Sequence, residues 1–90
     1  MYTKDQAHQD TVDTLMSMYE ENLLQVLGMI RSRANRGLYK LVYTILSDKE
    51  TDFIEDLEMK ADGIAYLLCN LGYTVNIISS PTFIQLHISW

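Results

Sequence analysis

A short basic segment carries the residue types best suited to bind a ligand. Four of the seven cationic side chains fall within ten residues, and a tyrosine lies among them. Arginines can hold a phosphate through paired hydrogen bonds, and an aromatic ring can stack on a base. The segment therefore predicts a nucleotide site formed by Arg31, Arg33, Arg36, Tyr39 and Lys40. The alternative is a helix end whose cations match the helix dipole and keep the surface soluble.

Other reactive residue types do not form a recognisable arrangement. Seven carboxylates lie between Asp48 and Asp62. They could bind a metal or mimic DNA, but a metal site requires ligands that converge, so we interpret them as a solvated helix face. His87 has no acid placed to orient it, and the single cysteine, Cys69, has no partner at zinc-ligand spacing. The four glycines stand singly, so there is no phosphate-binding loop. We predict a protein that is not an enzyme, with no catalytic residue, metal or cofactor.

Length and composition restrict the class of protein. Ninety residues form one domain, and a chain of this size needs a disulfide, a metal or another subunit to add stability. Because the first two are not predicted, self-association remains. The net charge of −5 disfavours general nucleic-acid binding, and no apolar run is long enough to span a membrane. A lone cysteine and a polar N-terminus favour the cytoplasm.

The first element is predicted to be a long helix over residues 5–36, ending at Gly37. Steps of four and three place six residues on one stripe close to a heptad repeat. Further leucines and methionines beside this stripe make the helix apolar around most of its circumference, more than one small sheet can cover. We therefore expect the helix to mediate oligomerisation through Val12, Met16, Tyr19, Leu23, Val26 and Ile30.

The remaining chain alternates strands and one helix. Residues 38–46 and 73–78 show the period of two that marks strands, and residues 83–90 show it most clearly. Ser47 and Glu50 match a capping box that would open a second helix ending near Asn70. The pattern predicts an α+β domain over residues 1–90, ordered helix–strand–helix–strand–strand. Its three-stranded mixed sheet would have strand order 1-3-2, with two helices on one face.

The C-terminal two thirds resembles a type of small protein encoded by tailed bacteriophages. The resemblance lies in the helix ending near Gly37, the segment Leu71-Gly72-Tyr73-Thr74-Val75 and the final Ile88-Ser89-Trp90. It implies the cytoplasm of a bacterial host as the setting. Our leading hypothesis is a homo-oligomeric binding protein that engages or inhibits a host protein. Two alternatives stay open: a sponge that sequesters a nucleotide signal at a subunit interface, and a virion or assembly component.

Overall fold

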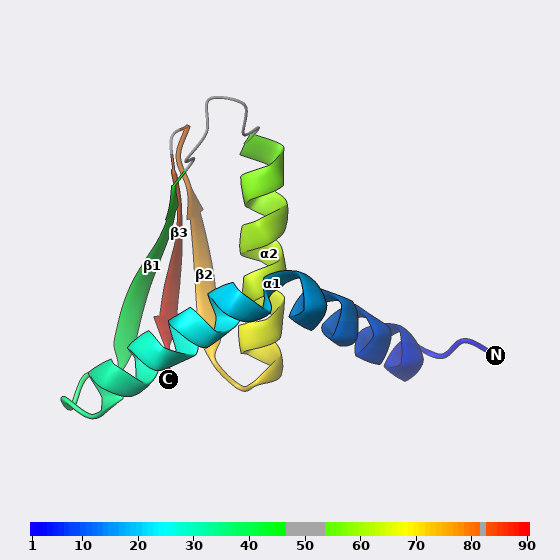
Figure 1. Cartoon of the computed structure of the whole chain (residues 1–90), viewed down its shortest axis with the longest axis horizontal. Helices are drawn as coiled ribbons and strands as arrows, with labels where there is room; N and C mark the ends of the chain where they lie inside the picture. Colours follow the sequence, from blue (N-terminus) through cyan, green and yellow to red (C-terminus); the bar gives the residue numbers. More distant parts are fainter. Residues whose placement is uncertain (47–53, 82) are drawn as a thin grey trace.

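The computed structural model of the chain describes residues 1–46, 54–81 and 83–90. Within these ranges the elements follow the predicted order helix–strand–helix–strand–strand, which confirms the α+β class (Figure 1). The capping box predicted at Ser47 and Glu50 lies outside the described residues, as does the start of the acidic run from Asp48 to Asp52. Among the described residues, no helix has the length and apolarity that a membrane crossing requires.

Helix α1, Lys4–Ala34, begins and ends through local chemistry. The hydroxyl of Thr3 accepts a hydrogen bond from the backbone N–H of Gln6, and the Gln6 side chain accepts one from the N–H of Thr3. These reciprocal bonds form a capping box, which the sequence analysis did not identify. At the other end Gly37 has a φ of +81°, and the N–H of Leu38 donates to the carbonyl of Arg33. The predicted glycine stop is confirmed.

The sheet consists of β1 (Lys40–Leu46), β2 (Thr74–Ser79) and β3 (Phe83–Ser89). The order is β1-β3-β2, as predicted, and both pairings are antiparallel. The expectation of a mixed sheet was therefore wrong. The hairpin returns β3 into the space between β1 and β2, so these two parallel strands are never neighbours and no parallel pair forms.

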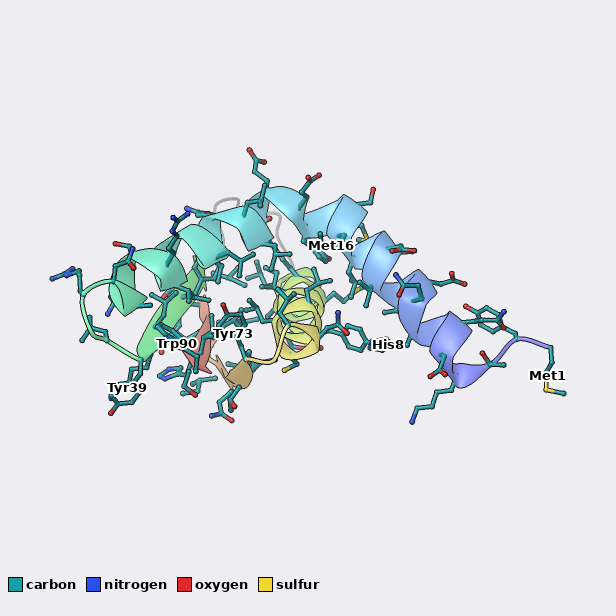
Figure 2. The ribbon with its side chains drawn as sticks, turned by 90° about the horizontal axis from the view of Figure 1, so that it is seen from below. Met1, His8, Met16, Tyr39, Tyr73 and Trp90 are labelled. Atoms are coloured by element: carbon teal, nitrogen blue, oxygen red, sulfur yellow. The ribbon has the colours of Figure 1, made fainter. Side chains whose placement is uncertain are left out.

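Helix α2, Ile54–Asn70, lies along one face of the sheet and is followed by Gly72, whose φ is +100°. The second half of α1 packs on the same face, so both helices lie on one side of the sheet (Figure 2). Alternate residues of the strands point into this layer, and those of β3 are the most completely buried. The core consists of Leu23, Val26, Ile30, Leu41, Ile45, Leu57, Ala61, Ile64, Leu67, Leu68, Ile84, Leu86 and Ile88.

Candidate interaction surfaces

The two halves of α1 lie in different surroundings because the helix bends at Tyr19, whose φ of −124° and ψ of 21° are not helical. The second half lies over the sheet, and the first half turns past the side of α2 and projects away from the fold (Figure 1). A Cβ placed on Gly63 of α2 would lie 2.7 Å from Cε2 of Tyr19 and 3.0 Å from Cδ2 of Leu15. Because Gly63 has no side chain, the side chains of Tyr19 and Leu15 can contact the backbone of α2 at the bend.

The predicted oligomer stripe is divided by this bend. Leu23, Val26 and Ile30 are buried in the core of their own chain, which removes them from the surface and corrects that part of the interface assignment. The sheet reaches under the second half of α1 and covers them. Val12 and Tyr19 are partly buried against the core, and Met16 is 41% exposed. Of the predicted stripe, Met16 offers the most surface to a neighbour.

A polar contact that the sequence did not reveal ties the first half of α1 to α2. The Nε2 atom of His8 lies 2.8 Å from Oδ1 of Asn70, and the hydroxyl of Tyr66 hydrogen-bonds to Nδ1 of His8. An amide oxygen only accepts, so Nε2 donates to Asn70 and Nδ1 accepts from Tyr66. The two partners lie 62 and 58 residues from His8 along the chain. No local spacing signals such a contact.

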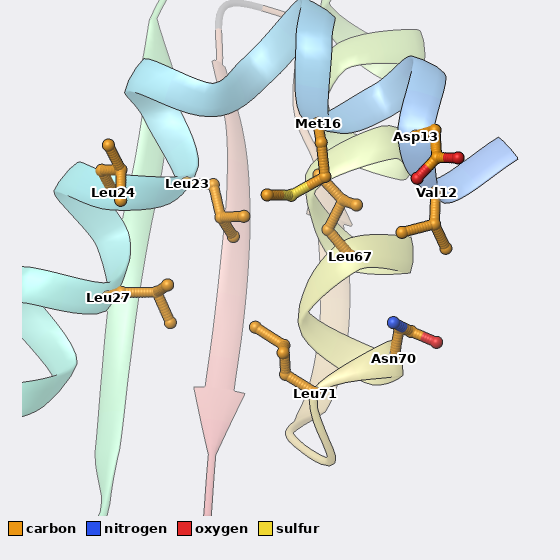
Figure 3. Close-up of a pocket in the computed structure, with 9 residues that line it drawn as sticks. All are labelled: Val12, Asp13, Met16, Leu23, Leu24, Leu27, Leu67, Asn70 and Leu71. Atoms are coloured by element: carbon orange, nitrogen blue, oxygen red, sulfur yellow. The ribbon is translucent and has the colours of Figure 1, made fainter. Parts of the chain in front are cut away.

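An apolar groove of about 390 Å³ lies under the arch of α1, beside the C-terminal end of α2 (Figure 3). Its walls combine residues from both halves of α1 with residues from α2, and Asp13 and Asn70 are its only polar lining residues among those described. Leu24 of α1 and Leu71, just after α2, are 62% and 55% exposed. The apolar lining residues are Val12, Met16, Leu23, Leu24, Leu27, Leu67 and Leu71.

Aromatic residues lie at the end of the sheet where α2 leads into β2. Tyr73 and Trp90 pack edge to face with ring centroids 6.3 Å apart, and the backbone N–H of Trp90 donates to the carbonyl of Tyr39. Seen from below, Tyr39, Tyr73 and Trp90 gather at the end of the sheet (Figure 2). We call the groove and these aromatic residues the apolar end surface; its most exposed members are Met16, Leu24, Tyr39, Leu71 and Trp90.

The predicted ligand residues are all exposed, and the structure brings only some of them together. Arg33 and Lys40 line a concavity of about 360 Å³ beside Val42 and His87. Arg31 and Arg36 do not line it. Tyr39 lies outside it too, although its ring centroid is 5.7 Å from Nζ of Lys40. The described lining contains no acidic residue, so the concavity is suited to an anion.

His87 was not predicted to take part in this site. It lies on β3 directly opposite Val42 of β1, on the face of the sheet that the helices leave open. The strand alternation already placed His87 and Lys40 on the same face, and this was the signal that could have added His87 to the site. Its Nε2 atom lies 3.2 Å from Oε1 of Gln85.

Other chemistry finds little support in the part of the chain that is described. No three of the histidine, cysteine, aspartate and glutamate side chains there come together as metal ligands. Cys69 is exposed near the end of α2. Comparisons of the chain with protein-family models, with curated proteins and with solved structures find no significant match.

Proposed function

We propose that this chain is a non-enzymatic binding protein that works as a homo-oligomer and engages a host protein in the cytoplasm of a phage-infected bacterium. The observation that carries the proposal is the apolar end surface. Exposed apolar side chains are ordinary when scattered, but a contiguous patch beside a groove is typical of an interaction site. Here leucines and aromatic residues from α1, α2 and the strand ends lie on one side of the molecule.

A different surface is proposed for the host partner. Three residues of α2 face outward at helical spacing: Glu58, Met59 and Asp62. Met59 is 65% exposed, and the exposed Glu58 and Asp62 beside it carry negative charge, so this surface is suited to a partner with an apolar patch next to basic residues. Charge complementarity of this kind accelerates encounter and excludes wrong partners.

Sedimentation equilibrium of the purified chain tests the oligomer directly. At micromolar concentration we expect a mass of two or more chains. A mass of one chain under these conditions contradicts the proposal. For the partner, the double variant Met59→Lys, Asp62→Lys should keep the oligomer and lose a host protein that co-purifies with the parent. The control is Thr74→Lys, Asn76→Lys, because both residues are exposed on the open face of the sheet. Equal loss in both variants contradicts the α2 surface.

A second candidate function is a nucleotide sponge. The concavity that joins Arg33, Lys40 and His87 favours it, because two cations and an imidazole from three elements face one space. Titration calorimetry with linear and cyclic nucleotides tests binding. Arg33→Ala should weaken it about tenfold or more, as expected for loss of a charged hydrogen bond, whereas Arg36→Ala serves as a control because Arg36 does not line the concavity. Equal effects of the two variants contradict this site.

A further inference from the structure

The molecule exposes more surface than a compact chain of its size. A folded monomer of 10.4 kDa is expected to expose about 5,400 Å², whereas this chain exposes 6451 Å². Its radius of gyration is 14.0 Å, against about 12 Å for a compact domain of this length. The excess of roughly 1,000 Å² is similar to the ~800 Å² that each partner contributes to a standard protein interface. Contact with one further subunit would therefore cover an area similar to this excess.

Charges on α1 are distributed in a way that suits a second copy of the same helix. Its carboxylates, from Asp5 to Glu21, precede its arginines, Arg31 and Arg33, and Lys4 is the only cation in the first half. Both groups are exposed. When two such helices lie antiparallel, the acidic part of each meets the basic part of the other. A parallel arrangement would place like charges together.

The spacing on the helix selects a register. Leu24 and Arg31 lie on the same half of α1 and are seven residues apart, about two helical turns, so they fall on the same side of it. Asp13 and Leu24 both line the groove, so the bend keeps this side continuous. The midpoint between Asp13 and Arg31 is residue 22, and Leu24 lies only about 3 Å along the axis from it. A twofold axis there brings Leu24 of both copies together between two pairs of Asp13 and Arg31.

Gly28 provides an independent observation. A glycine inside a helix costs about 1 kcal/mol relative to alanine, and its own fold gives no steric reason for it, because a Cβ at this position would meet nothing within 4 Å. Gly63, by contrast, is required by the ring of Tyr19. Gly28 lies one helical turn after Leu24 and next to the side that carries Leu24 and Arg31, where a missing side chain allows two helices to approach closely.

We propose that the apolar end surface is closed by a second copy of this chain, related by a twofold axis near residue 22, with the two α1 helices antiparallel. This inference rests on the proposed homo-oligomer and deepens it by naming the partner, the symmetry and the residues at the axis. An isologous contact repeats every interaction, so Asp13 of each copy lies against Arg31 of the other. The groove of each copy is covered by the exposed Met16 and Leu24 of the other's α1.

Sedimentation equilibrium of the parent, of Leu24→Asp, of Met18→Asp and of the charge variants described below tests the arrangement. Leu24 and Met18 are 62% and 58% exposed, so both substitutions should leave the fold intact, but only Leu24 lines the groove. We expect the parent to be a dimer and Leu24→Asp to raise its dissociation constant about a hundredfold or more, because symmetry buries the new charge twice. Met18→Asp should leave it unchanged.

The charge variants test the register. Asp13→Arg and Arg31→Asp should each weaken the dimer about tenfold at low salt, and combining them should restore it, because the reversed charges again face each other. Additive weakening in the double variant would overturn the register. A parent oligomer that survives Leu24→Asp and dissociates with Met18→Asp, or one with more than two subunits, overturns the inference and leaves the proposed homo-oligomer standing. A monomeric parent overturns both.

Discussion

The two halves of α1 have nearly the same sequence pattern and different roles in the fold. From Leu23 to Ile30 the apolar stripe is buried by the sheet and α2. Before Tyr19 the same periodicity continues, but the helix has passed the edge of the fold and rests only on the side of α2. Periodicity therefore shows which side of a helix is apolar, and the extent of the neighbouring layer decides how much of that side the chain itself covers.

The means of attachment differ as well. The second half is held by close packing of aliphatic side chains in the core. The first half is held by Val12, Leu15 and Tyr19, which are partly buried against the core, and further out by the hydrogen bonds of His8 with Asn70 and Tyr66. Exposed hydrogen bonds contribute less than buried packing. We expect the first half to open locally at a lower free energy than the second.

The largest expected effect compares two leucines, one in each half. Leu23→Ala should lower the free energy of unfolding by about 3 to 4 kcal/mol, because Leu23 is 2% exposed and its removal leaves a cavity in the core. Leu15→Ala should lower it by about 1 to 2 kcal/mol, since Leu15 is only partly buried. Urea unfolding at a concentration low enough to keep the protein monomeric measures both. Equal losses would show that the two halves are equally part of the core.

Much of the fold follows from local patterns that the sequence displays. The glycine stops at Gly37 and Gly72, the alternation of Ile84, Leu86 and Ile88, and the position of β3 between the other strands were all predicted and confirmed. These features depend on short stretches of chain, or on a hairpin whose geometry is limited. The strand order β1-β3-β2 separates the two parallel strands β1 and β2, so no parallel pair forms.

The surfaces were harder to predict because they depend on which elements meet. The stripe on α1 gave no sign of the bend at Tyr19, which arises where α1 meets Gly63 of α2. Leu23, Val26 and Ile30 were therefore assigned to an interface when they belong to the core. The groove residues Leu27 and Leu71 lie far apart along the chain, and only the packing of α2 under α1 brings them together.

The second prediction contrasts two glycines. Gly63→Ala should lower the free energy of unfolding by about 1 to 2 kcal/mol, because its Cβ would overlap Tyr19 and the strain exceeds the gain in helix propensity. Gly28→Ala should raise it by up to about 1 kcal/mol, since open space surrounds that position. Both substitutions are made in a Leu24→Asp background, so that self-association does not contribute to the free energy of unfolding. Urea midpoints that move in the same direction would contradict the role given to Gly63.

A smaller effect is expected at the outer end of the first half. His8→Ala removes both hydrogen bonds to α2, and the amides of the first turns of α1 should exchange with solvent several-fold faster, corresponding to about 1 kcal/mol. Gln9→Ala is the control, because Gln9 bonds only to Asp13 one turn later on the same helix. Hydrogen exchange followed residue by residue separates the two. Unchanged protection in His8→Ala would mean that packing alone holds this half.

The smallest effect concerns the very start of the chain. The hydroxyl of Tyr2 donates to a carboxylate oxygen of Asp10 at 2.6 Å, and this hydrogen bond, with some desolvation and the negative charge of Asp10, raises the pKa of Tyr2 above its ordinary value. A raised pKa means that the bond is fully present below the ordinary pKa of about 10 and is lost as the pH rises through the higher value. Ultraviolet titration should show Tyr2 ionising at a lower pH in Asp10→Asn than in the parent, because the substitution removes the negative charge that raises its pKa. Because Tyr2 is exposed, the global free energy of unfolding should not follow this titration, which again separates the first half of α1 from the packed half.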